Sequence, residues 1–226
     1  MCPENGQSRQ LLRRLSGNFT LSERAYVGIK EAILTLELKP GATLVEEELA
    51  RTLGTSATPV RDALKRLQRD GLVQQGPYRT TTVTKVTLQD EREIVELREV
   101  VEGLLGRLVV SRITTEELDE AEAMLVAYDE AIENHDLRKA TELSENFHSV
   151  LLAHCPNGRL REQLGALGDQ MRRLLLIYDV GMERMRQSSS EHWAILRALR
   201  CRNPEEVEAA IRTHHRTFLN DLSNRE

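Results

Sequence analysis

A short basic segment is the part of this sequence whose residue types point most directly to a binding chemistry. Between Arg51 and Lys85 seven basic residues are opposed only by Asp62 and Asp70, so the segment carries a charge of +5. The whole chain carries −5, which leaves −10 for the remainder. Contacts from Lys and Arg to phosphate supply much of the affinity of proteins for nucleic acid. We therefore expect one small module that meets DNA phosphates, attached to an acidic body.

The sequence lacks common catalytic motifs and the cysteine spacing of a zinc knuckle. The cysteines Cys2, Cys155 and Cys201 are scattered and odd in number, which favours reduced thiols over a disulfide framework. Neither a G-x-S-x-G nucleophile elbow nor an H-E-x-x-H zinc motif occurs. We therefore expect a protein that is not an enzyme.

Composition limits the location and the architecture of the chain. No apolar run approaches the ~20 residues needed to span a bilayer, and the first residues lack the pattern of a secretory signal. We expect a cytoplasmic protein with no membrane partner. Only 4% of the 226 residues are aromatic, so the core must be built from aliphatic side chains, which favours packed helices.

The N-terminal third is predicted to hold three helices after a flexible tail at residues 1–20. The first helix begins at the N-cap Ser22 and stops before Pro40, and the second covers residues 45–53 and ends at Gly54. The third is predicted to have Thr58 as its cap and Pro59 in its first position. The apolar residues of these helices recur at helical spacing, so we expect them to form a small core.

After the third helix the pattern changes from helical to extended. Residues 72–75 and 80–84 favour strands, and the turn at Gly76 and Pro77 separates them. Three helices followed by a two-stranded ribbon are typical of a winged helix-turn-helix. We therefore predict such a domain over residues 21–86.

The remaining residues, 87–226, are predicted to form an antiparallel all-α bundle that binds an effector and dimerises. The expected helices cover residues 88–111, 115–134, 137–153, 159–185, 190–201 and 204–222. A capping box from Thr114 to Glu117 and a cap at Asn203 mark two of the joints. The predicted fold class is thus mainly α, with a winged helix-turn-helix followed by a helical bundle.

With these residues laid out, the chain resembles the GntR superfamily of bacterial regulators, specifically the FadR-like branch with an FCD ligand-binding domain. The resemblance covers residues 22–222. In the first half it is carried by the segments 38–41, 48–50, 58–64 and 67–73. In the second half it is carried by Leu97-Arg98 with Glu102, Phe147-His148, Glu191-His192 and His214.

The resemblance implies that Arg61 is the arginine of the recognition helix that reaches DNA. An arginine there can bond bidentately to guanine in the major groove. The other candidate DNA contacts are Thr55, Ser56, Thr58, Lys65, Arg66 and Arg79. The chain departs from many relatives at Ala57 and Glu47, where they carry arginine, so sequence preference cannot be transferred from them.

The resemblance also implies a divalent metal inside the bundle, bound by three histidines and one aspartate. His148, His192 and His214 match the histidine positions, and imidazole suits zinc or nickel. The aspartate position holds Ser144, so we consider Glu145 as the substitute acid. The alternative is a metal-free polar pocket. His215, which follows His214 directly, is predicted to lie on the surface.

Basic residues in the bundle would then select the effector. Arg98 is implied by the resemblance, and Arg172 and Arg173 are placed by their helix, so a carboxylate is the expected ligand. The alternative for Arg98 is an internal ion pair with Glu102.

Together these residues predict a homodimeric transcription repressor that binds a palindromic operator and responds to a small metabolite. Two alternatives remain at this point. One is a metal-dependent hydrolase, and the other is a metabolite-binding module that has lost DNA binding.

Overall fold

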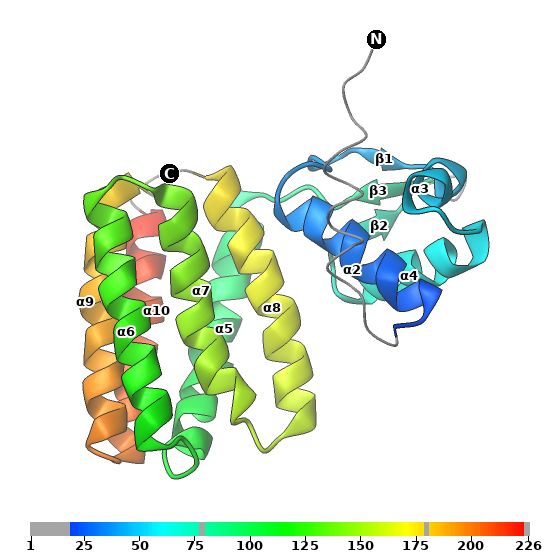
Figure 1. Ribbon diagram of the computed structural model, residues 1–226. Helices are drawn as coiled ribbons and strands as arrows, with labels where there is room; N and C mark the ends of the chain where they lie inside the picture. The colour runs from blue at the N-terminus through cyan, green and yellow to red at the C-terminus, as the bar shows by residue number, and fades with distance from the viewer. Residues whose placement is uncertain (1–18, 77–79, 179–180, 224–226) are drawn as a thin grey trace. The chain divides into compact units, whose positions relative to one another are not determined.

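The computed structural model describes residues 19–76, 80–178 and 181–223, so Arg79 and most of the expected N-terminal tail lie outside the described residues. The chain divides into two compact units, Met1–Val86 and Thr87–Glu226. Figure 1 shows each unit as a ribbon. Within the described residues the first unit contains helices and a small sheet, and the second contains only helices, which confirms the predicted fold class.

Three helices form the body of the first unit: α2 (Leu21–Leu34), α3 (Glu46–Leu53) and α4 (Ala57–Arg69). Their apolar faces enclose one core, in which Ile33, Val60 and Leu67 are fully buried. The cap of α2 is Thr20, which forms a capping box with Glu23, so the predicted cap at Ser22 is wrong. The Thr20 hydroxyl accepts a hydrogen bond from the backbone N–H of Glu23, and the Glu23 carboxylate accepts one from the backbone N–H of Thr20. Two backbone N–H groups at the start of the helix, which have no partner within it, are thereby satisfied.

A tight turn between α3 and α4 produces the helix-turn-helix. Gly54 ends α3 in the left-handed conformation with φ of 63°, which glycine adopts without a steric penalty. Ser56 then occupies the N-cap of α4. Thr58 and Pro59 are therefore the second and third residues of the helix, two positions later than predicted.

The sheet of the first unit has three antiparallel strands, β1 (Thr43–Leu44), β2 (Val73–Gln75) and β3 (Thr81–Val83), in the order β1-β3-β2. The ribbon of β2 and β3 was predicted, with Val73 opposite Val83. Strand β1 was not predicted, and it pairs with the other side of β3. Two residues are too few to show the alternation by which strands are recognised.

The second unit consists, within the described residues, of six helices: α5 (Leu88–Val109), α6 (Thr115–Glu133), α7 (Leu137–Ala153), α8 (Gly158–Ile177), α9 (Gly181–Arg200) and α10 (Pro204–Ser223). The predicted capping box of Thr114 and Glu117 and the cap at Asn203 are both formed. The predicted break near residue 190 is wrong. The chain ends α8 at Ile177 and begins α9 at Gly181, whose φ is 75°.

The packing of the bundle places α10 in contact with both α5 and α9, while α7 packs against α6 and α8 (Figure 1). Side chains from α5, α7, α9 and α10 therefore meet in the interior. None of the described helices combines the length and the apolar character that a membrane span requires.

Candidate functional site

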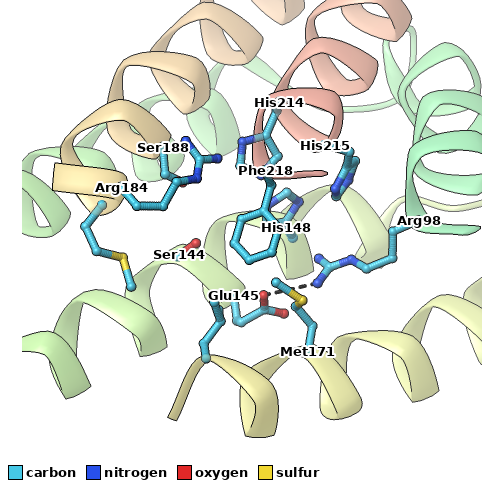
Figure 2. A pocket seen from close by; sticks show the side chains of 12 residues that line it. Arg98, Ser144, Glu145, His148, Met171, Arg184, Ser188, His214, His215 and Phe218 are labelled. Carbon is cyan, nitrogen blue, oxygen red and sulfur yellow. Dashed lines mark hydrogen bonds and ion pairs between the residues drawn. The ribbon is translucent and has the colours of Figure 1, made fainter. Parts of the chain in front are cut away.

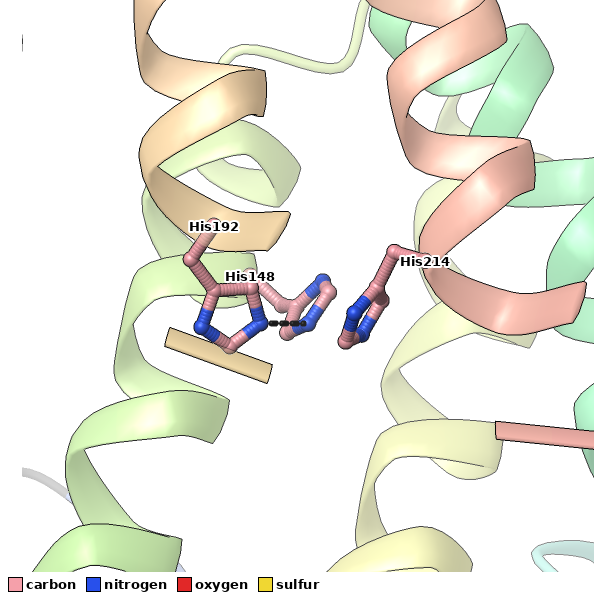
Figure 3. A group of neighbouring side chains, drawn as sticks. All are labelled: His148, His192 and His214. Carbon is pink, nitrogen blue, oxygen red and sulfur yellow. Dashed lines mark hydrogen bonds between the residues drawn. The ribbon is translucent and has the colours of Figure 1, made fainter. Parts of the chain in front are cut away.

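Three histidines from three helices converge inside the bundle. His148 lies on α7, His192 on α9 and His214 on α10, and each offers one ring nitrogen within 4.8 Å of the others (Figure 3). The Nε2 atoms of His148 and His192 are 3.2 Å apart. His192 is fully buried, and the other two rings are largely buried.

Carboxylates contact the opposite sides of two of these rings. Glu102 on α5 places Oε2 2.9 Å from His148 Nδ1, and Glu191 on α9 places Oε2 2.7 Å from His214 Nδ1. A carboxylate at the second nitrogen of a histidine fixes the ring orientation and its tautomer, as in most metal sites. The two carboxylates therefore aim Nε2 of His148 and of His214 at the interior.

Burial decides the protonation of the cluster. It lowers the pKa of His192 and of His214 well below the ordinary histidine value, and the neighbouring imidazoles add to the effect. Burial alone would raise the pKa of Glu102, but Arg98 and two histidines hold it well below its ordinary value. These directions favour neutral His192 and His214 and an ionised Glu102, and neutral imidazole is the form that binds a metal.

One pair of the ring nitrogens has the spacing of two ligands on one metal ion. Two nitrogens bound to one zinc ion at the usual bond length of about 2.0–2.1 Å are separated by about 3.0–3.4 Å. The separation of 3.2 Å between the Nε2 atoms of His148 and His192 falls in that range. Three imidazoles from a buried cluster, with carboxylates behind two of them, are a donor set that suits zinc or nickel.

A pocket opens beside the histidines. Its free volume is about 30 Å3, enough for roughly two water molecules. Its polar wall contains Arg98, Arg184, Ser144 and Ser188 together with His148, His214 and His215 (Figure 2). Its apolar wall is formed by Met171, Leu175, Met185 and Phe218. A polar wall and an apolar wall thus meet next to the ring nitrogens.

Of the residues predicted to bind the effector, Arg98 lines this pocket, whereas Arg172 and Arg173 are not among the described residues that line it. Arg98 forms the internal ion pair considered as its alternative, with Nε 2.5 Å from Glu102 Oε1. It also reaches Glu145, whose Oε1 is 3.3 Å from Arg98 Nη1. Glu145 lies at the pocket and pairs with Arg98, outside the group of converging histidines.

His215 is not on the surface, so that prediction is wrong. Its side chain is buried, and its Nε2 lies 3.0 Å from Glu102 Oε2. Because α10 packs against α5 on one side and α9 on another, two consecutive residues of α10 both face the interior. Glu102 thus contacts histidines from α7 and α10 at once.

Arg184 on α9 is a pocket residue that the sequence reasoning missed. Its guanidinium pairs with Glu191, with Nη2 2.9 Å from Oε2, and its Nε lies 3.2 Å from Asp221 Oδ2. Arg184 stands eight residues before His192, with Ser188 midway. This spacing puts all three on one helix face and is the signal that could have identified it.

In the first unit, the predicted DNA-reading residue Arg61 lies on the exposed side of α4. It is held by Glu46 of α3, with Nη2 2.6 Å from Oε2 and Nε 3.0 Å from the same oxygen. Lys65 is exposed and near Asp62. The guanidinium of Arg66 stacks 3.8 Å from the centre of the Tyr26 ring, so Arg66 is also part of the packing between α4 and α2.

The hydroxyl residues before and in α4 differ in their access to a ligand. Ser56 and Thr58 are exposed at the start of the helix, and Ser56 makes no side-chain capping bond. The hydroxyl oxygen of Thr55 is buried. Backbone N–H groups at a helix N-terminus attract phosphate, so Ser56 and Thr58 are the better placed of the three to contact DNA.

Two family models match the chain. The model described as bacterial regulatory proteins, gntR family, matches residues 21–83, and the FCD domain model matches residues 93–217. The FCD match alone covers more than half of the chain.

Relatives extend over most of the chain. The HTH-type transcriptional repressor RspR of Escherichia coli (strain K12) is 28% identical over 197 residues, which cover 86% of this chain and 85% of RspR. An uncharacterized HTH-type transcriptional regulator in an unstable DNA locus of Streptomyces ambofaciens is 32% identical over 202 residues, covering 87% and 83%. The solved structure of E. coli McbR/YncC has the same fold, with a TM-score of 0.77 and 24% identity over 92% of this chain and 99% of that chain. These relatives are regulators and not enzymes, so they give the hydrolase alternative no support.

Proposed function

The chain belongs to the GntR family of bacterial regulatory proteins and carries an FCD domain, and from this premise we propose a metal-containing, dimeric repressor that a small carboxylate releases from DNA. As a member of this family it is a ligand-responsive DNA-binding transcription regulator. Binding to chromosomal DNA would place it in the cytoplasm. The metal, the dimer, the palindromic operator and the carboxylate are the parts that we propose.

The observation that carries the proposal is the convergence of His148, His192 and His214 with carboxylates behind two of the rings. Zinc or nickel bound there would supply a Lewis-acidic position for one carboxylate group of an effector. Glu102 holds His148 in orientation, and Glu191 does the same for His214. Ser144 faces the same pocket in place of an acid, so one fewer negative charge opposes an anionic ligand.

The DNA-binding part of the proposal rests on α4. Arg61 projects from its exposed face near the helix N-terminus, where a side chain in the major groove can reach a base edge. Ser56, Thr58 and Lys65 would contact phosphate from the same region. Arg79 belongs to the proposed wing contacts and lies outside the described residues.

The dimer part rests on an exposed apolar stripe along α5. Leu97, Val100 and Leu104 are 50%, 53% and 44% exposed, and their spacing of three and four residues puts them on one face. An antiparallel pair of α5 helices centred on Val100 would bring Glu93 of one copy near Arg107 of the other. Arg107 also pairs with Glu205 and Glu208 of its own chain, so Glu93 of the other copy would join an existing group of ion pairs at the two-fold interface.

Helix α5 would also connect the effector with the dimer. Arg98 lines the pocket and pairs with the buried Glu102, while the adjacent Leu97 and Val100 lie on the exposed stripe. A ligand that favours one position of α5 over another would change the dimer geometry and the spacing of the two recognition helices. A tenfold loss of operator affinity needs a difference of about 1.4 kcal/mol between the two states.

The test is to select binding sites from a random DNA library with the full-length protein and then measure affinity by fluorescence anisotropy. We expect palindromic sites, a tenfold or greater loss of affinity in Arg61→Ala, and little change in the control Arg138→Ala on α7. Non-palindromic sites would contradict the dimeric arrangement. Equal affinity of Arg61→Ala and the unmodified protein would contradict the assignment of α4.

A further inference from the structure

We propose that Asp129 of α6 is a positioning residue that holds His192 of α9 where it can bind the metal. This inference rests on the proposed function, because it assumes that the three converging histidines are metal ligands. It is carried by two hydrogen bonds between α6 and α9 and by the surroundings of the His192 ring.

His192 differs from the other two histidines in how its ring is held. A carboxylate contacts Nδ1 of His148, and another contacts Nδ1 of His214. Nδ1 of His192 is buried and has no hydrogen-bond partner among the residues that the structure describes. A partner at the second nitrogen is the usual device that fixes the orientation of a metal-binding histidine. The position of His192 must therefore come from other contacts.

Two aromatic rings confine the His192 ring. Its centre lies 5.0 Å from that of Phe147 and 5.6 Å from that of Tyr128, and all three side chains are buried. Apolar contacts have little directional preference. They restrict the space around the ring, but they do not fix the rotation of α9 or its position along its own axis.

Asp129 supplies a directional contact to the same part of α9. Its Oδ1 accepts a hydrogen bond from the Ser189 hydroxyl, and its Oδ2 accepts one from Trp193 Nε1 at 3.0 Å. Ser189 and Trp193 are four residues apart, so they lie on one face of α9 in successive turns. His192 lies between them in the sequence. One carboxylate thus holds two turns and resists rotation and sliding of α9 at His192.

The position of α9 sets the spacing of the ring nitrogens. The Nε2 atoms of His192 and His148 are 3.2 Å apart, which is the spacing of two ligands on one zinc ion. A small displacement of α9 changes this distance directly, because His148 belongs to a different helix. Asp129 therefore acts on the metal through His192, without contact to the ion.

The experiment measures the zinc affinity of the full-length protein by competition with a chromophoric chelator, after the metal has been removed by dialysis. Asp129→Ala is expected to lower the affinity at least about tenfold, as is usual for residues that orient metal ligands. The cobalt-loaded variant should also have an altered visible absorption spectrum, because that spectrum depends on the arrangement of ligands around the ion. Unchanged affinity and spectrum in Asp129→Ala would overturn the proposal.

Asp119→Ala is the matched control. Asp119 also joins α6 to α9, with Oδ1 2.8 Å from Arg200 Nη2, but it lies about three turns away from Asp129 along α6. This variant should keep the zinc affinity of the unmodified protein. An equal loss in both variants would assign the effect to a general loosening of the two helices and would overturn the proposal.

Asp129→Asn separates hydrogen bonding from charge. Its amide oxygen can accept from Trp193 and its NH2 group can donate to the Ser189 hydroxyl, so zinc affinity should stay within about threefold of the unmodified protein. Binding as weak as that of Asp129→Ala would show that Asp129 acts through its charge, and the positioning role would be overturned.

Variants of the two donors decide the question where Asp129→Ala does not fold. Trp193→Phe and Ser189→Ala each remove one hydrogen bond and leave the carboxylate in place, so each should weaken zinc binding about two- to fivefold. Full affinity in both would overturn the proposal. Absence of zinc binding by the unmodified protein would overturn the metal site itself, whereas tight binding by every variant would overturn only the role of Asp129.

Discussion

Arg61 and Glu46 form a two-pronged ion pair between the two helices of the helix-turn-helix, with Arg61 Nη2 2.6 Å from Glu46 Oε2. The pair joins α4 to the first turn of α3. Arg61 is 55% exposed, so water competes with the contact and the pair is weak in energy. The guanidinium is thus oriented by a partner that it would have to give up in the proposed contact with a base.

Glu46→Gln is expected to raise affinity for DNA about two- to fivefold at low salt, because Arg61 no longer exchanges an ion pair for a DNA contact. Anisotropy titrations across salt concentrations measure it. Glu47→Gln is the matched control, since it removes the same charge from α3 without touching Arg61. If both variants gain affinity equally, general charge and not the release of Arg61 is responsible.

His148→Ala is expected to remove most of the bound metal, because it deletes one of the three converging ring nitrogens. Metal analysis of protein purified without a metal-affinity resin measures the stoichiometry, with zinc added back. His154→Ala is the control, because His154 lies at the end of α7 beside Glu117. Full metal content in His148→Ala would rule out the proposed ligand set.

Val100→Glu is expected to shift the protein from dimer to monomer at micromolar concentration, because it places two like charges at the centre of the proposed interface. Sedimentation velocity measures the species. Val126→Glu on α6 is the control, since Val126 is 47% exposed and lies on a different helix. A Val100→Glu protein that remains dimeric would show that the subunits associate through another surface.

Gly106→Ala is expected to lower the free energy of unfolding by about 1–3 kcal/mol, because the added methyl group overpacks the contact of α5 with α10. A Cβ there would lie 2.6 Å from Ile211 Cδ1 and 2.7 Å from Val207 Cγ1. Urea denaturation measures the change. Gly165→Ala on α8 meets no atom within 4 Å and should stabilise the helix by up to about 1 kcal/mol. Equal stability of the two variants would contradict the tight packing at Gly106.

Much of the fold could be predicted because the signals are local. The capping box of Thr114 with Glu117 and the cap at Asn203 depend on residues three positions apart or fewer, and both form as expected. The joint between α8 and α9 was misplaced because apolar residues continue to Met185 across it. The break depends on the backbone of Gly181, whose left-handed conformation leaves no trace in hydrophobic periodicity.

Features of the site that depend on one helix could be predicted from the sequence, whereas contacts between helices could not. Family resemblance indicated His148, His192 and His214, but His215 was assigned to the surface by the angle between consecutive residues. That argument assumes one buried face, whereas α10 is covered on two sides. The contact of Arg184 with Asp221 joins residues on different helices, and periodicity within one helix cannot predict such a pair.

The opposed faces of α5 restrict how this protein can change during evolution. Leu97 and Arg98 are neighbours in sequence, yet one lies on the exposed stripe and the other lines the pocket. Inserting or deleting a single residue before Leu97 would rotate the helix by about 100° at that point. The pocket would then lose Arg98 at the same step at which the exposed stripe loses Leu97. Variation along α5 should therefore be limited to substitutions, while insertions are confined to the turns between helices.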